Sequence, residues 1–108
     1  MFFYKPSERK SKEIVPGGMI RTFWGDNTLL SVVDLEPNVE VTLHTHPQEQ
    51  SGMVLEGQMK MRIAGEWRTL TAGDIYIIPG GIEHAAKTSS THARVLDIFS
   101  PVREDYKY

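Results

Sequence analysis

The 108-residue sequence contains no cysteine. Disulfide bonds, a thiolate nucleophile and a cysteine-ligated zinc site are therefore excluded, and any bound metal must be held by nitrogen and oxygen atoms. The sequence also lacks a basic block, and its formal net charge is only −2. It has no apolar run of membrane-spanning length. We therefore expect neither a nucleic acid nor a membrane as a partner.

Helical periodicity is nearly absent as well. Short runs rich in Val, Ile, Leu, Thr and aromatic residues alternate with Gly, Pro, Asn and Asp, which predicts many short β-strands. This pattern indicates an all-β fold, an antiparallel sandwich or barrel. The polar segment 7–12 is expected to form a loop or one helical turn, and 87–92 a loop. Strands are predicted at 20–24, 29–35, 39–46, 52–55, 59–63, 66–70, 75–78 and 94–99.

The composition, 40% hydrophobic and 24% charged, is typical of a globular protein and not of a disordered one. We expect a single domain over residues 1–108, with an N-terminal arm at 1–19, a barrel at 20–103 and a C-terminal tail at 104–108. The opening MFFYKP is too short and too early interrupted by Pro6 to be a signal peptide, so we expect a cytoplasmic protein.

Two histidines, His44 and His46, lie one residue apart in the predicted strand 39–46. Strict alternation places Val39, Val41 and Leu43 on one face and both histidines on the other. The imidazoles would then line either open solvent or a polar interior. Two exposed strand histidines are the plain alternative to a functional pair.

Other side chains could join these histidines around one ion. Gln50 has the same parity as both histidines if the strand pairing continues without a bulge, and His84 follows a Pro-Gly-Gly turn that can aim an imidazole back over a sheet. Three imidazoles and an amide oxygen, without a thiolate, suit one divalent transition metal ion such as Zn, Ni, Mn, Fe or Co. The sequence does not select among these metals.

The predicted strand 94–99 places Asp97 on the same face as Phe99. A carboxylate beside an aromatic ring is unusual on an exposed face and typical of a ligand pocket. Each residue also has a simpler explanation. Asp97 could be a buried carboxylate satisfied by backbone donors, Phe99 could belong to the core, and Arg103 could pair with its acidic neighbours at the surface. We expect Met59 and Met61 to line the interior.

These residues carry a resemblance that covers roughly residues 38–103. The second of two motifs matches at each of its four positions: Gly73, Pro79, Gly81 and His84. The first motif is matched by His44, His46, Gln50 and Gly57. On these motifs the chain is identified as a member of the cupin superfamily, the small single-domain cupins. The resemblance implies a small antiparallel β-barrel of two facing sheets, with metal-binding residues inside near one open end, and a homodimer.

Three positions depart from the family pattern. Asn38 replaces the usual Gly that opens the first motif, but Asn also tolerates a left-handed turn conformation. Thr88 replaces the Asn that often ends the second motif. Gln50 replaces the usual metal-binding Glu. The neighbouring Glu49 is the alternative, but its parity points it to the other side, so we prefer Gln50. A neutral amide leaves the site one negative charge short, which makes a bound ion more Lewis-acidic and weakens its binding.

The stretch HTHPQEQSGMVLEG, together with LDIFSPVREDY, resembles the KdgF-type cupins of pectin and alginate degradation. These proteins convert 4,5-unsaturated uronates to open-chain keto sugars. The resemblance implies that His44, His46, Gln50 and His84 bind the metal, and that Asp97, Phe99 and Arg103 complete the active site. The expected partner is thus a small-molecule substrate, a sugar acid.

Other functions are compatible with the same residues. The chain could be another metal-dependent cupin enzyme, a dioxygenase or an isomerase, with the same site and a different reaction. It could also bind a small molecule without catalysis, or be a structural barrel with an empty site. The absence of an attached output domain argues mildly against a sensor.

Overall fold

A computed structural model describes residues 2–108. Within them, no helix is long and apolar enough to cross a membrane. Short 3-10 turns, η1 (Pro6–Glu8) and η2 (Glu104–Tyr106), lie near the two ends of the described chain. The rest is built of strands: β1 (Lys12–Val15), β2 (Gly18–Trp24), β3 (Leu29–Leu35), β4 (Glu40–His44), β5 (Glu49–Ile63), β6 (Glu66–Thr71), β7 (Ile75–Ile78), β8 (His84–Lys87) and β9 (Ala93–Ser100).

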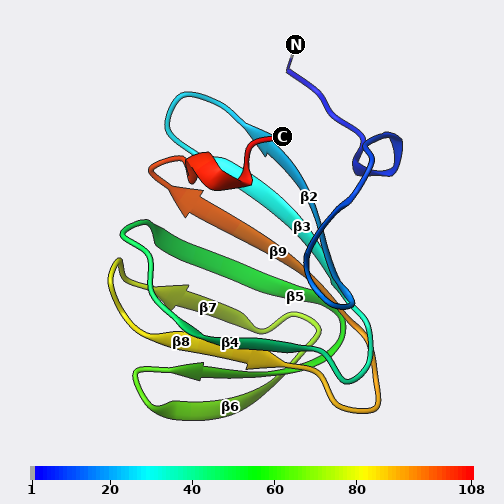
Figure 1. Cartoon of the computed structure of the whole chain (residues 1–108), viewed down its shortest axis with the longest axis vertical. Helices are drawn as coiled ribbons and strands as arrows, with labels where there is room; N and C mark the ends of the chain where they lie inside the picture. Colours follow the sequence, from blue (N-terminus) through cyan, green and yellow to red (C-terminus); the bar gives the residue numbers. More distant parts are fainter. Residues whose placement is uncertain (1) are drawn as a thin grey trace.

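The strands pair antiparallel throughout and curve into a nearly closed barrel (Figure 1). One side follows the order β1-β2-β3-β9-β5, with β7 also paired to β5. The other side consists of β4, β8 and β6, of which β8 and β6 pair with the second half of β5. The long strand β5 therefore belongs to both sides and joins them. The predicted all-β barrel is confirmed.

The pattern of turn residues predicted the bounds of β3 and β7 correctly. It was wrong at β5, which it divided into strands at 52–55 and 59–63. Glu56 and Gly57 do not end the strand. They directly follow a register shift against β9, which lies between Val54 and Glu56, and Gly57 has a positive φ of 75°. The signal for a turn was therefore a β-bulge, at which β5 bends from one sheet into the other.

Two strands were not predicted. β1 follows the polar segment 7–12, and β8 begins at His84. Neither has the run of β-branched or aromatic residues that identifies a strand. β8 exists because it pairs with β4 on one side and β5 on the other, and β1 because it pairs with β2. These strands are products of tertiary pairing, which a local pattern does not contain.

The barrel interior is filled by apolar side chains from both sheets. Met59 and Met61 are 2% and 5% exposed and line this interior, as predicted. Burial of each large apolar side chain contributes about 1.5–3 kcal/mol, so this cluster is the main stabilising feature of the barrel. Its buried members include Ile20, Val33, Leu35, Val39, Val54, Met59, Met61, Tyr76, Ile78, Ala86, Ala93 and Val95.

The two turn positions that depart from the cupin pattern are accommodated locally. Asn38 adopts a left-handed conformation with φ of 58°, which Asn tolerates better than most residues. The Thr88 hydroxyl is buried, and its Oγ1 accepts a hydrogen bond of 2.9 Å from the Val39 backbone N–H. Both substitutions therefore retain the turns between β3 and β4 and after β8.

Candidate metal centre

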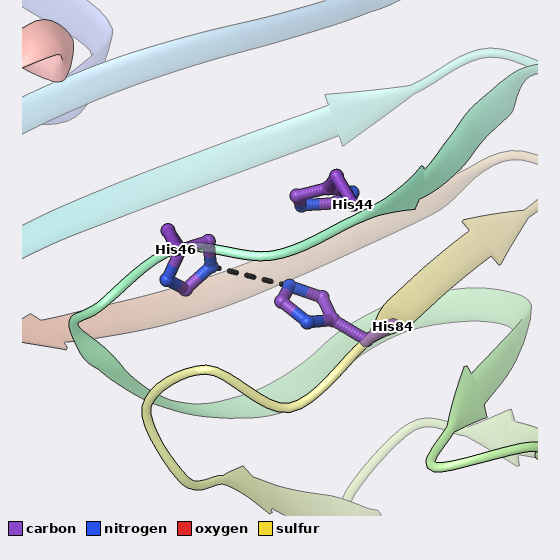
Figure 2. Close-up of side chains that lie close together, drawn as sticks. All are labelled: His44, His46 and His84. Carbon is purple, nitrogen blue, oxygen red and sulfur yellow. Dashed lines mark hydrogen bonds between the residues drawn. The ribbon is translucent and has the colours of Figure 1, made fainter.

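Three histidine rings converge inside the barrel (Figure 2). His44 ends β4, His84 begins β8, and the two residues are directly paired in the register of these strands. His46 lies in the turn after β4, where its backbone carbonyl accepts a 2.9 Å hydrogen bond from the Gly81 N–H of the Pro-Gly-Gly turn. The three rings offer nitrogen atoms that all lie within 4.8 Å of one another.

The strand that carries His44 does not follow the predicted alternation. Val41 pairs with Ala86 and His44 pairs with His84, so β4 has gained one residue against β8 between these positions. This bulge turns Val41 and His44 onto the same inner face, while Leu43 is 46% exposed. The prediction that Leu43 shares a face with Val41 was therefore wrong. The bulge is what directs His44 into the barrel.

The backbone fixes which nitrogen of each ring faces the centre. Each Nδ1 lies beside a carbonyl oxygen: His44 beside Thr42 at 2.7 Å, His46 beside Gln48 at 3.0 Å, and His84 beside Ile82 at 2.8 Å. A carbonyl only accepts, so each Nδ1 carries the hydrogen and each Nε2 keeps its lone pair. This is the arrangement by which proteins orient metal-binding histidines.

The lone pairs of this cluster face one another. His46 Nε2 lies 3.2 Å from His84 Nε2 and 3.0 Å from Gln50 Oε1. With the hydrogens on Nδ1, all three atoms are acceptors, so their close approach is unfavourable unless a cation lies among them. Neutral nitrogen and amide oxygen donors suit a borderline divalent transition metal. The residues present therefore fit the metal site that the sequence predicted.

Burial keeps two of the imidazoles neutral. It lowers the pKa of His84 to about 4, with the hydrogen bond to the Ile82 carbonyl opposing the change. The pKa of His46 is also lowered, mainly by burial and then by the positive charge of Arg103. A histidine must be unprotonated to bind a metal, so low pKa values reduce competition from protons.

Gln50 lies on β5 between β7 and β9, where it pairs with Ile78 and Phe99. It is 6% exposed and lines the interior, whereas Glu49 is exposed. Gln50 therefore faces inward as predicted, but the parity argument assumed an unbroken strand from the histidines, whereas residues 45–48 lie outside both β4 and β5. Besides facing His46, the Gln50 side chain forms a hydrogen bond with Asp97. Because a carboxylate accepts and Oε1 faces the histidines, the amide nitrogen is the donor.

Asp97 lies on β9 and faces the same cavity as Phe99, as the alternation predicted. Its Oδ1 accepts a hydrogen bond from the Tyr76 hydroxyl. Burial raises the pKa of Asp97 to about 6, against the opposing effects of Tyr76, Gln50 and the Arg103 charge. A carboxyl group with a pKa near the working pH can both release and accept a proton.

Phe99 and Arg103 line the same cavity as Asp97. The Phe99 ring is 1% exposed and makes an edge contact with His46 at 5.5 Å between centroids. The Arg103 guanidinium lies 5.3 Å from the Phe99 ring centroid and 3.8 Å from that of Tyr106. Arg103 also forms an ion pair with Asp105 at 3.2 Å, the alternative that the sequence left open. It nevertheless lines the same cavity as Asp97.

The cavity has a volume of about 60 Å³. That is room for about two water molecules. Its walls are largely apolar, and its polar side chains come from the predicted metal ligands, β7, β9 and the C-terminal segment. They are His44, Gln50, Tyr76, His84, Asp97, Arg103 and Tyr106.

Two of these residues were not identified from the sequence, Tyr76 and Tyr106. Tyr76 stands in the apolar run IYII and looks like any core aromatic, and Tyr106 lies beyond the last predicted strand. Arg21 of β2 does not line this cavity and instead pairs with Asp34 at 3.1 Å. The pairing of β7 with β5 brings Tyr76 to the cavity, and the turn η2 beyond the last strand brings Tyr106 to it.

Comparisons with known proteins agree with this geometry. A family model described as a cupin domain matches residues 31–99. The pectin degradation protein KdgF of Dickeya dadantii is 29% identical over 84 residues, which cover 77% of this chain and 76% of that protein.

Two solved structures are similar over nearly their full length. KdgF from Halomonas sp. superposes with a TM-score of 0.91 at 26% identity, covering 97% of each chain. An RmlC-like cupin from Shewanella frigidimarina gives a TM-score of 0.92 at 25% identity, covering 99% of this chain and 96% of that one.

Proposed function

This chain belongs to the cupin domain family, and we propose that it is a metal-dependent enzyme that converts 4,5-unsaturated uronates to open-chain keto sugars. The observation that carries the proposal is the arrangement of one cavity. Three Nε2 lone pairs and an amide oxygen converge beside an acid of raised pKa and a guanidinium. The similarity to proteins named for pectin degradation supports a sugar acid as the substrate.

The reaction that we propose is an isomerisation. In the cyclic substrate, C5 bears the carboxylate, is double-bonded to C4 and is joined through the ring oxygen to the hemiacetal carbon C1. The bond between C1 and the ring oxygen breaks, the C1 hydroxyl loses its proton, and an aldehyde forms at C1. The ring oxygen takes up a proton and remains on C5 as an enol. Transfer of a proton to C4, with loss of the enol proton, gives the ketone, and no electron is gained or lost.

Each proposed catalytic residue has a part in this sequence. Asp97 carries protons between substrate atoms, because its pKa near 6 lets it act as base and as acid. Arg103 binds the substrate carboxylate through its planar guanidinium. Phe99 packs against the sugar ring and excludes water. Since the cavity has a volume of only about 60 Å³, we place the sugar ring at its mouth.

We propose that His44, His46, Gln50 and His84 hold one divalent transition metal ion. When bound, the ion supplies Lewis-acid stabilisation of substrate oxygens. A metal without redox chemistry suffices, because the proposed reaction is redox-neutral. Zinc, nickel, manganese, iron and cobalt all accept such donors.

Removal of the metal tests the proposed function. We expect the purified protein to abolish the ultraviolet absorbance of a 4,5-unsaturated uronate, which comes from the double bond conjugated to the carboxylate. Dialysis against a chelator should stop the reaction, and an added divalent ion should restore it. The control variant His92→Ala should keep the activity and the metal dependence of the wild type, because His92 is an exposed histidine that pairs with Glu56.

The same assay distinguishes the other functions. Oxygen uptake with an aromatic or thiol substrate, without loss of the uronate band, would indicate a dioxygenase. Binding of a uronate without turnover would indicate a non-catalytic cupin. Turnover that is unaffected by complete metal removal would contradict the proposal.

We further propose that the chain acts as a single domain in a homodimer. Exposed apolar side chains gather on the outer face of β3, β5 and β7, which carry Leu30, Met53, Leu55, Ile75 and Ile77. Exposed apolar side chains on one sheet face are typical of a protein interface. Sedimentation should show a dimer that Ile75→Lys converts to a monomer. The control Trp67→Lys, at an exposed residue of β6, should remain dimeric.

A further inference from the structure

Three neighbouring strands bring one residue each to the same point of the barrel wall. Gly52 of β5 pairs with Tyr76 of β7 on one side and with Asp97 of β9 on the other. Directly paired residues on adjacent strands project to the same face of the sheet. The side chains of Tyr76 and Asp97 therefore point into the barrel from either side of Gly52.

Only a glycine between them allows these two side chains to meet. A Cβ atom on residue 52 would overlap the Cζ and Oη atoms of Tyr76 and lie 2.6 Å from Asp97 Oδ1. The backbone of Gly52 is in an ordinary strand conformation, so no unusual φ explains the glycine. The requirement is space: the phenol crosses β5 through the position that a side chain would fill.

The contact that results is a hydrogen bond from the Tyr76 hydroxyl to Asp97 Oδ1. Tyr76 is 6% exposed, and burial, with the nearby Asp97 charge, raises its pKa well above the usual value. The hydroxyl therefore keeps its hydrogen and donates it to the carboxylate. The Gln50 amide provides a further hydrogen bond to the same carboxylate.

We propose that Tyr76, reaching across Gly52, is a positioning residue that fixes the orientation of the Asp97 carboxylate for proton transfer. The inference rests on the proposed catalytic role of Asp97. Rotation about the last bond of an aspartate is broad when nothing restrains it. Anchoring Oδ1 restrains that rotation, so that the carboxylate is already oriented when substrate arrives. Misplacement by about 1 Å can reduce an enzymatic rate on the order of a hundredfold.

The substitution Tyr76→Phe tests this inference, since it keeps the ring and removes the hydroxyl. We expect kcat to fall about ten- to a hundredfold. KM and metal content should stay at wild-type values, because Tyr76 contacts neither the predicted metal ligands nor Arg103 in the described hydrogen bonds. Tyr108→Phe is the matched control: it removes a hydroxyl that donates to the Lys10 carbonyl at 2.6 Å, away from the cavity. Its kcat should not change.

The substitution Gly52→Ala disrupts the contact between Tyr76 and Asp97 without removing the tyrosine hydroxyl. The added methyl group must push Tyr76 and Asp97 apart, so kcat should fall to a similar extent. In the double variant Gly52→Ala/Tyr76→Phe, the two losses should not add, because both act through the same hydrogen bond. Full additivity, or an unchanged kcat in Tyr76→Phe, would overturn the inference.

A readout that needs no substrate keeps this inference distinct from the proposed function. In protein with isotope-labelled aspartate, the NMR signal of Asp97 Cγ should shift in Tyr76→Phe and stay in place in Tyr108→Phe. If the wild-type protein does not act on unsaturated uronates, the proposed function fails, and the NMR signal alone decides. A shift then supports the positioning role, and an unchanged signal refutes it.

Discussion

Asp97→Asn should lower kcat by about 10²- to 10⁴-fold, the range expected when a general acid-base group is lost. Asparagine has nearly the same shape, and its side-chain oxygen can still accept the Tyr76 hydrogen bond. It cannot accept or release a proton at neutral pH. The loss should therefore appear in turnover and not in metal binding. Steady-state kinetics on an unsaturated uronate, with metal analysis of the same sample, measure both effects.

The stability of this variant distinguishes a lost proton carrier from a damaged fold. The raised pKa of Asp97 shows that its charged form is disfavoured by burial. A neutral amide is cheaper to bury, but it has one acceptor oxygen in place of two, so thermal stability at neutral pH should stay close to the wild-type value. The control Asp34→Asn should keep the wild-type kcat, because Asp34 pairs with Arg21 and Arg94 on strands of the same sheet and does not line the cavity. Wild-type kcat in Asp97→Asn would show that this residue carries no proton.

Gln50→Glu should bind the divalent ion more tightly than the wild type and yet turn over on the order of 10²-fold more slowly. A carboxylate facing His46 adds the negative charge that the site lacks. It also replaces the N–H that Gln50 donates to Asp97 with a second acceptor. Two adjacent carboxylates disfavour each other's ionised form, so the pKa of Asp97 should rise further. Asp97 would then remain protonated at neutral pH and could not act as a base.

Competition with a chromogenic chelator measures metal affinity, and the uronate assay measures turnover. Glu49→Gln is the matched control, since Glu49 is adjacent in sequence, carries the reverse change and is exposed. Neither affinity nor turnover should change in that variant. If Gln50→Glu kept full activity, the amide would have no role toward Asp97. If it lost the metal, residue 50 would not face the ion as described.

The sequence predicted the parts of the site that lie on regular strand. Asp97 and Phe99 occupy β9, whose pairing with β3 has no register shift, so counting by twos gave the correct face. Gln50 also faces inward, but not for the expected reason, because residues 45–48 interrupt the strand on which its parity with the histidines was counted. His84 was predicted from its position after the Pro-Gly-Gly turn and from the second cupin motif, because no periodicity identifies β8. The alternation of side chains along a strand predicts the correct face wherever the strand pairing has no register shift.

The features that sequence reasoning missed depend on irregular pairing or on three strands at once. The bulge between Val41 and His44 reverses the alternation in β4, and nothing in the letters VTLH indicates it. The relation of Tyr76 to Asp97 exists only because Gly52 lies between them in the folded sheet. Glycine in a strand and tyrosine in an apolar run are each ordinary. Their contact is determined by the register of three paired strands, which is a property of the tertiary structure.

The central claim is that His44, His46 and His84, with Gln50, bind one metal ion beside Asp97. Anomalous diffraction from crystals of the protein loaded with cobalt or zinc tests it most directly. We predict one strong peak among the three Nε2 atoms, at metal–nitrogen distances of about 2.0–2.1 Å, with Gln50 Oε1 among its ligands. Loaded crystals with no peak at this position, or with the ion bound through Nδ1 atoms or elsewhere, would contradict the account.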